Sequence, residues 1–253
     1  MLKMKKAMQV AALSLVSVTP MAQAIILEGS FTGTIYNSYD RFNEFGEGVG
    51  NNTVVGETVT GTFTIDTDLM PSDRDNRPNN TNHIENGVDD WFTFELETSF
   101  GHSWSSDAIN QNTGATRDWD QAYIENDYAS YSRDRILLRE YAYDNVGDRN
   151  YDTFYLQVLS DNGTHLNGDD FLDDAVLPES FDMAGTDFGL ARGYVRNYTY
   201  ENSQIHEDFT YIWNLNTLEW APAEVPEPSS IAMFGLGLIG LGFARRRVNA
   251  QQI

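Results

Sequence analysis

Hydrophobic and polar residues alternate with a period of two along much of the chain between residues 25 and 224. For example, Phe92, Phe94 and Leu96 fall on one face of an extended chain, and the polar residues between them fall on the other. Loops rich in Asn, Asp, Gly and Ser separate such segments, and no long segment has the period of an amphipathic helix. The segments that we expect to be strands are 30–36, 58–65, 91–97, 122–126, 135–143, 153–158, 191–200 and 209–215. The pattern predicts an all-β body, a single antiparallel domain of the β-sandwich or jelly-roll type.

The N-terminal end departs from this pattern. Residues 1–24 combine a lysine-rich start, a short apolar stretch and a small-x-small site at Ala22 and Ala24, which are the three parts of a secretory signal peptide. We therefore expect export, with signal peptidase leaving Ile25 as the first residue of the mature protein.

The C-terminal end contains a second apolar stretch, residues 229–244, followed by a basic cluster, residues 245–247. Residues 235–240 match the G-x-G-x-x-G spacing of a dinucleotide-binding turn, but no acidic residue follows to hold a ribose. A membrane segment is the better interpretation. As a helix, residues 231–244 would span roughly 21 Å, less than the roughly 30 Å of a hydrocarbon core, which suits a transient anchor. The arginines should stay in the cytoplasm, which places the body in the periplasm.

The residues before and after this apolar stretch complete a recognisable tail. A Val-Pro-Glu-Pro segment, an apolar glycine-rich helix and an arginine cluster follow one another over residues 225–247. This order resembles the PEP-CTERM sorting tail, a tail that is also labelled an ice-binding protein C-terminal domain, although that label does not by itself imply ice binding. Within the tail, the residues of the sorting motif are Pro226, Glu227, Pro228, Arg245, Arg246 and Arg247.

The resemblance implies a Gram-negative bacterium and processing by exosortase, a membrane transpeptidase that acts near the Pro-Glu-Pro. It also implies a link to exopolysaccharide and biofilm, and a final location at the cell surface or outside the cell. The expected organisation is a signal peptide at residues 1–24, a β-sandwich body at residues 25–224 and a sorting signal at residues 225–247.

Charge and cysteine content narrow the chemistry of the body. The formal net charge is −22, and the basic residues at both ends make the segment between them still more acidic. Such a surface repels phosphate backbones, so we expect no nucleic-acid partner. The absence of cysteine excludes disulfides, thiolate metal sites and cysteine nucleophiles.

A calcium site is the strongest candidate for bound metal. Asp66, Asp68, Asp73 and Asp75 offer carboxylates on one loop, with asparagines nearby, and oxygen ligands of this kind suit calcium. Residues 161–174 form a second acidic cluster. Neither cluster has the spacing of an EF-hand loop, and the alternative is a solvated acidic loop.

The remaining signals leave three functions open. The leading expectation is a non-enzymatic structural role at the cell surface or in the matrix, with no catalytic or cofactor-binding residue. The first alternative is a carbohydrate-binding module, with or without the assistance of calcium, because aromatic rings on a β-sandwich can stack on sugars. The second is a secreted hydrolase that uses a pair of acids such as Glu95 and Glu97. The aromatic residues that stand beside polar ones are Tyr36, Tyr39, Trp119, Tyr128, Tyr131, Tyr151, Tyr194 and Tyr198, although core packing could account for most of them.

Overall fold

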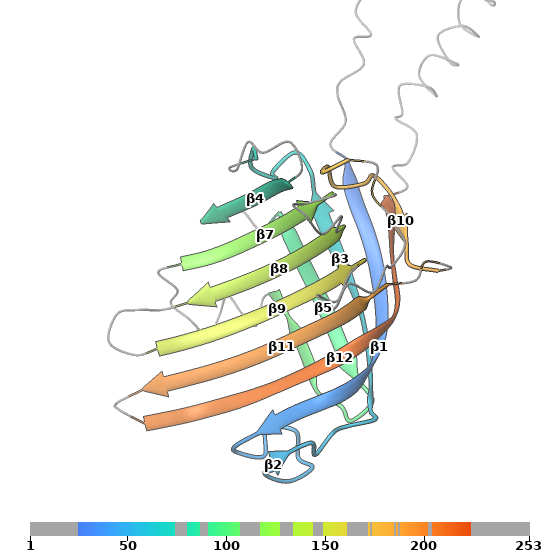
Figure 1. Cartoon of the computed structure of the whole chain (residues 1–253). Coiled ribbons are helices and arrows are strands. Elements are labelled where there is room, and N and C mark those ends of the chain that lie inside the picture. Colours follow the sequence, from blue (N-terminus) through green and yellow to red (C-terminus); the bar gives the residue numbers. More distant parts are fainter. Residues whose placement is uncertain are drawn as a thin grey trace, which may run out of the picture. The chain divides into compact units, whose positions relative to one another are not determined.

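The described part of the body folds into twelve antiparallel β-strands (Figure 1). The computed structural model describes residues 25–73, 80–86, 91–106, 117–126, 134–143, 149–160, 172, 174–184, 186, 188–201 and 204–223. Within those residues no helix is long and apolar enough to cross a membrane. The predicted signal peptide and membrane segment lie outside the described residues.

The strands follow the alternation seen in the sequence. In chain order they are β1 (Ile26–Asp40), β2 (Gly50–Asn51), β3 (Thr58–Asp66), β4 (Asn80–Asn86), β5 (Phe92–Thr98), β6 (Ser103–Ser105), β7 (Arg117–Glu125), β8 (Arg135–Tyr143), β9 (Arg149–Leu159), β10 (Phe181–Asp182), β11 (Leu190–Glu201) and β12 (Gln204–Pro222). Their order across the sheet is β4-β7-β8-β9-β11-β12-β1-β3-β5-β6, with β2 paired to β1 and β10 paired to β12. The prediction of an all-β antiparallel body is confirmed.

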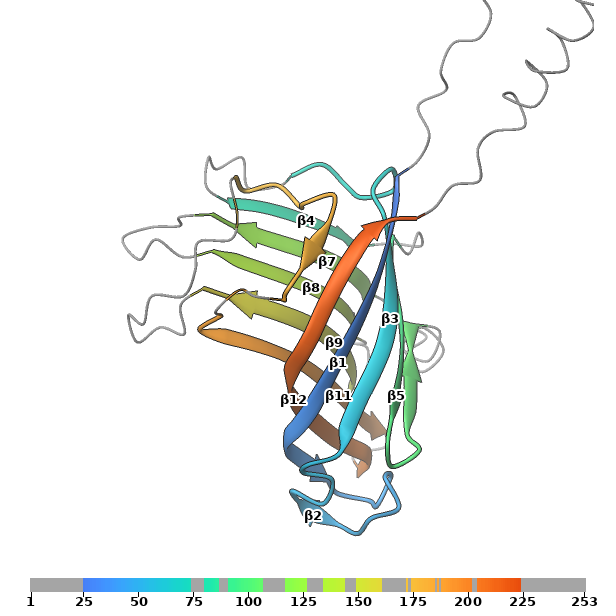
Figure 2. The same cartoon turned by 90° about the vertical axis from the view of Figure 1, so that its right-hand side faces the viewer.

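A single sheet curls over itself to make two layers. Strands β4, β7, β8, β9 and β11 form the first layer, and β3, β5 and β6 belong to the second (Figure 1). The two longest strands, β12 and β1, join the layers, and their pairing contains irregularities at Thr32/Gly33 and Ile35/Asn37. Bulges of this kind bend and twist a strand, which lets one sheet turn a corner. Seen from the side, the strands of the two layers cross (Figure 2).

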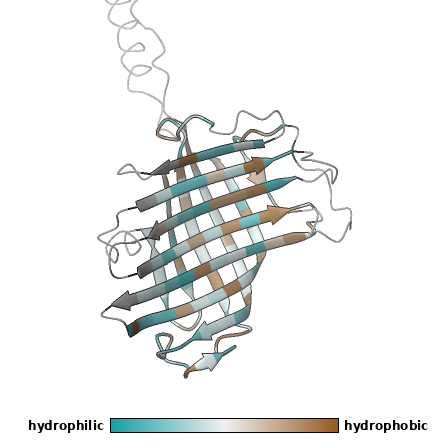
Figure 3. Ribbon diagram, turned by 60° about the vertical axis from the view of Figure 1, so that its left-hand side comes forward, coloured by the Kyte–Doolittle hydropathy of each residue, from teal (hydrophilic) through white to brown (hydrophobic). Residues whose placement is uncertain are grey.

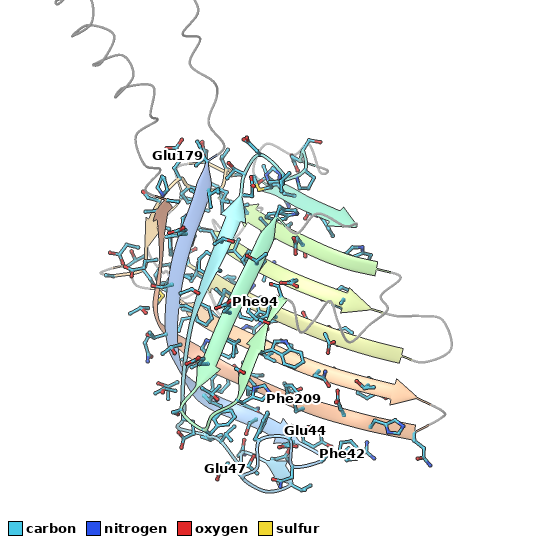
Figure 4. The ribbon with its side chains drawn as sticks, turned by 180° about the vertical axis from the view of Figure 1, so that it is seen from behind. Phe42, Glu44, Glu47, Phe94, Glu179 and Phe209 are labelled. Atoms are coloured by element: carbon cyan, nitrogen blue, oxygen red, sulfur yellow. The ribbon has the colours of Figure 1, made fainter. Side chains whose placement is uncertain are left out.

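Aromatic side chains fill the space between the layers. Phe94 of β5, labelled in Figure 4, stacks on Phe154 of β9 with ring centroids 3.7 Å apart. Phe31 of β1 stacks on Trp213 of β12 at 6.1 Å. All four side chains are at most 2% exposed. Burial of each of these side chains contributes about 1.5–3 kcal/mol. The contact between Phe94 and Phe154 joins strands of different layers and so helps to hold the two layers together.

Glycines make room for these large rings. A Cβ atom at Gly193 would lie 2.0 Å from Cε2 of Trp213, and one at Gly33 would lie 2.1 Å from Cδ1 of the same indole. A Cβ atom at Gly61 would lie 2.3 Å from Cζ of Phe31. No real Cβ atom approaches so closely, so each aromatic ring packs directly on the backbone of a neighbouring strand.

Candidate functional site

The outer face of the first layer is built mainly from arginines and tyrosines. Along each strand of this layer one residue in two points inward, such as Ile136 and Leu138 on β8 and Phe154 on β9. The alternation is visible as hydrophilic and hydrophobic bands along the strands (Figure 3). Outward positions of these strands also include Gln121, Glu125, Leu137 and Thr153. We call the following outward residues the Arg–Tyr face: Trp119 and Tyr123 on β7, Arg135, Arg139 and Tyr141 on β8, Tyr151, Tyr155 and Gln157 on β9, and Arg192, Tyr194, Arg196 and Tyr198 on β11.

A pair of stacked tyrosines occupies the centre of the Arg–Tyr face. Tyr155 and Tyr194 are directly opposite in the ladder between β9 and β11, and their rings lie 4.9 Å apart at an angle of 12°. Arg139 on β8 pairs with Tyr155 from the other side. Burial raises the pKa of both tyrosine hydroxyls, with Arg192 opposing the rise at Tyr155 and Arg196 at Tyr194. The two hydroxyls are therefore neutral at physiological pH and can both donate and accept hydrogen bonds.

Arginine side chains lie over the neighbouring rings. The guanidinium carbon of Arg139 is 4.6 Å from the ring centroid of Tyr141. That of Arg196 is 5.4 Å from the ring of Tyr151 and 5.6 Å from the ring of Tyr198. Such cation–π contacts orient a guanidinium group and leave its charge in place.

Arg135 closes one edge of the face differently. Its guanidinium carbon lies 5.0 Å from the ring of Tyr123, and its Nη1 atom is 3.8 Å from a carboxylate oxygen of Glu125. Burial raises the pKa of Tyr123 to about 12, and Glu125, which accepts its hydroxyl hydrogen bond, adds to the rise. The positive charge of Arg135 at this edge is therefore balanced by the carboxylate of Glu125.

An open hollow of about 380 Å³ lies over β8, β9 and β11. Arg139, Tyr155, Arg192 and Tyr194 are among the residues that line it. Half-buried ring faces can stack on the apolar face of a sugar, while guanidinium, amide and hydroxyl groups around them bond its oxygens. The chemistry of the hollow is that of a binding surface for an extended polar ligand.

The outer face of the second layer has a different composition. It carries short hydroxyl side chains and carboxylates in cross-strand rows, for example Thr217, Thr32, Thr60 and Glu97. The hydroxyls of Thr32 and Thr217 are 2.8 Å apart. The predicted acid pair, Glu95 and Glu97, lies on this face as neighbours along β5. The two outer faces therefore differ in both charge and aromatic content.

Two of the four predicted calcium ligands, Asp66 and Asp73, accept hydrogen bonds from backbone N–H groups. The Asp66 carboxylate accepts hydrogen bonds from the backbone N–H groups of Asp68 at 3.0 Å and Leu69 at 3.3 Å. Asp73 accepts one from the N–H of Asn82 at 2.9 Å, and Asp75 lies outside the described residues. No group of three or more potential metal ligands is present within the part of the chain that the structure describes. The calcium site stays a prediction, as does the second acidic cluster, most of which lies outside the described residues.

Five of the eight aromatic residues named from the sequence lie on or beside the Arg–Tyr face. Trp119, Tyr151, Tyr194 and Tyr198 are part of it, and Tyr36 of β1 is close enough to Tyr155 to raise its pKa. Tyr39 also lies on β1, and residues 128 and 131 fall outside the described residues. Sequence reasoning missed Tyr123, Tyr141, Tyr155 and the arginines of this face. Their spacing of two and four residues within strands was the signal that could have revealed them.

Comparison with known proteins concerns the C-terminal end. Residues 224–247 match the family model of the PEP-CTERM protein-sorting motif. The chain carries a PEP-CTERM sorting motif. The resemblance found at residues 225–247 is confirmed, and the motif implies an exported protein with a membrane-anchored tail that exosortase sorts. No curated protein and no solved structure matches the chain. The residues of the sorting motif themselves lie outside the described residues.

Proposed function

We propose that this exosortase-sorted protein is a non-enzymatic component of the cell surface or extracellular matrix that binds exopolysaccharide through its Arg–Tyr face. The observation that carries the proposal is the stacked pair Tyr155 and Tyr194, set in a hollow that polar groups surround. The sorting motif supports it, because an exported body is one that can meet exopolysaccharide.

The geometry of the face suits a polymer. Neighbouring strands lie about 4.8 Å apart, so aromatic and hydrogen-bonding side chains repeat across β7, β8, β9 and β11 at a nearly constant step. Tyrosines are suitable platforms because a large rigid ring loses little conformational entropy when a ligand covers it. A row of such platforms can hold several sugars of one chain, each contact being weak.

Affinity electrophoresis of the processed protein against exopolysaccharide from the producing cells tests the proposal. The test variant carries Tyr155→Ala and Tyr194→Ala. The control carries Thr32→Ala and Thr60→Ala on the outer face of the second layer, two exposed or half-exposed positions.

If each ring contributes about 0.5–1.5 kcal/mol, the value for aromatic pairs, the tyrosine variant should bind about 5- to 150-fold more weakly. The control should bind as the natural protein does. Equal binding by all three proteins, with thermal unfolding showing that each is folded, would refute a role for this face.

A further inference from the structure

We propose that the Arg–Tyr face selects an acidic polysaccharide, one whose sugars carry carboxylate groups. This inference rests on the proposed function, because it names the class of glycan that the same face binds. Arg139, Arg192 and Arg196 carry it.

The first observation is a local excess of positive charge on an acidic protein. The sequence between the signal peptide and the sorting tail contains no lysine and ten arginines, and four of those ten lie on the Arg–Tyr face. The only ion pair of this face among the described residues is the one between Arg135 and Glu125, at its edge. Arg139 and Arg192 face tyrosine rings and a glutamine. Arg196 lies over two tyrosine rings and is also close enough to Asp208 of β12 to oppose the rise in the pKa of that carboxyl group.

The second observation is that these arginines are held in place, and that neither Arg139 nor Arg192 has a carboxylate partner among the described residues. The Nε atoms of Arg139 and Arg196 are buried and have no hydrogen-bond partner within the described residues. Nε of Arg192 donates a hydrogen bond to Oε1 of Gln157 at 3.1 Å, and its guanidinium carbon is 5.6 Å from the centroid of the Tyr155 ring. A fixed guanidinium group loses little entropy when a ligand arrives, and its planar fork matches the geometry of a carboxylate.

The third observation is the placement of these charges around the stacked rings. Arg192 and Arg196 lie on one strand, two residues to either side of Tyr194, so their Cα atoms are about 13 Å apart. Arg139 lies two strands away from Tyr194, on the far side of Tyr155, so the Cα atoms of Arg139 and Tyr194 are about 10 Å apart. A sugar that stacks on Tyr155 or Tyr194 therefore has a guanidinium group on several sides. A carboxylate on that sugar or on the next one falls within reach of one of them.

The fourth observation is the contrast with the second layer. Its outer face presents Glu28, Glu95, Glu97 and Glu219 with no basic residue among its described outward positions. An acidic polymer is repelled there and attracted to the first layer, so the charge distribution orients the protein on the polymer. The rings add selectivity for sugars over other polyanions, because they offer apolar platforms at the spacing of the strands.

The experiment compares two forms of one polymer. Polygalacturonate carries a carboxylate on every sugar, and its fully methyl-esterified form has the same backbone without the charge. Binding of the processed natural protein is measured for both by isothermal titration calorimetry. A triple variant carries Arg139→Gln, Arg192→Gln and Arg196→Gln, and Arg41→Gln is the matched control, because Arg41 lies on the loop after β1.

We expect the natural protein and the Arg41 variant to bind polygalacturonate at least about tenfold more tightly than the ester, since charge-assisted hydrogen bonds are about twice as strong as neutral ones. The triple variant should bind both forms with nearly equal affinity. If the triple variant does not fold, Arg192→Gln alone should reduce the preference, and Arg192→Lys, which keeps the charge, should restore part of it.

Three other outcomes overturn the inference. If the natural protein binds both forms equally and the tyrosine variant binds neither, the face binds glycan but does not select acids, and the proposed function stands. If the natural protein binds neither polygalacturonate nor its methyl ester and does not bind exopolysaccharide either, the proposed function fails as well. If a single-stranded oligonucleotide binds as tightly as polygalacturonate and displaces it, the face is a surface for polyanions in general.

Discussion

Between pH 6.5 and 8 the stability of the body should fall as pH rises, because of one buried carboxyl group. Asp152 on β9 is 1% exposed, its Oδ1 atom accepts a hydrogen bond from Nδ2 of Asn197 at 2.8 Å, and its Oδ2 atom has no partner among the described residues. Burial, with a smaller contribution from the charge of Glu207, raises the pKa of Asp152 from 3.8 to about 8. In the unfolded chain this carboxyl ionises near pH 3.8, whereas in the folded protein it keeps its proton up to about pH 8.

The sign and size of the effect follow from this difference. Between these two pH values the folded state binds one proton more than the unfolded state, so the free energy of unfolding decreases as pH rises. The stabilising contribution is complete below pH 3.8 and is lost as pH approaches 8. A difference of about four pKa units corresponds to about 5–6 kcal/mol in total, or about 1.4 kcal/mol for each pH unit.

Replacing Asp152 by asparagine should remove this dependence, because the amide has nearly the same shape and no charge. Urea unfolding at pH 6.5, 7.25 and 8 should show the natural protein losing about 2 kcal/mol relative to Asp152→Asn across this interval. Asp68→Asn, which changes an exposed aspartate, should leave the pH dependence as it is in the natural protein. Parallel curves for Asp152→Asn and the natural protein would mean that Asp152 is already ionised in the folded state, which would refute the reasoning.

Three further predictions concern acid stability, packing and processing. Burial among aromatic rings lowers the pKa of His102 to about 4. As pH falls from 6.5 to 4, the natural protein should therefore lose about 3 kcal/mol of unfolding free energy relative to His102→Gln, measured by urea unfolding. Equal losses by the two proteins would contradict this. Gly193→Ala places a Cβ atom against Trp213 and should destabilise the protein by about 1–3 kcal/mol or more in thermal unfolding. The control Thr60→Ala should change stability little, and equal unfolding midpoints for the two variants would contradict the packing of Trp213 on Gly193. Alanines at residues 226–228 should leave the precursor unprocessed in a blot of cell fractions, and normal processing would argue against exosortase.

Most strands were predictable because they have one buried and one solvated face. The segment 135–143 coincides with β8, and the segment 91–97 is shifted by one residue from β5. By contrast, β4 was missed because its sequence, NTNHIEN, has a single apolar residue and forms the edge of the sheet. β12 extends well beyond the segment 209–215 at both ends, since a strand that passes from one layer to the other has no constant environment to impose one pattern.

Residues 56–67 follow the spacing G-x-x-V-x-G-x-F-x-x-D-T, and β3 gives this spacing a physical explanation. Val59 and Phe63 are buried on the inner face of β3, and Gly61 between them leaves room for the ring of Phe31. Asp66 then closes the turn after β3 by accepting backbone N–H hydrogen bonds. The pattern encodes a strand that packs aromatic rings and ends in a turn, so by itself it predicts fold and no activity.

The Arg–Tyr face could not be assembled from the sequence. Alternation places Tyr151 on one side of β9 and Tyr194 on one side of β11, but only the register between these strands shows that both sides are the same face. The arginines were hidden for another reason: a single net charge averages the basic face of the first layer with the acidic face of the second. The partner class excluded on net charge, nucleic acid, must therefore be tested on the individual face, which is why the oligonucleotide competition is included.

The tail and the Arg–Tyr face should act independently. The sorting motif occupies residues 224–247, whereas the residues proposed to bind glycan come from β7, β8, β9 and β11 within the compact body. Alanines at residues 226–228 should therefore change where the protein accumulates and leave its affinity for polygalacturonate unchanged. The triple arginine variant should be processed normally and lose its preference for the charged polymer. If either variant changed both properties, binding and sorting would be coupled, and the exopolysaccharide would then be part of the sorting step itself.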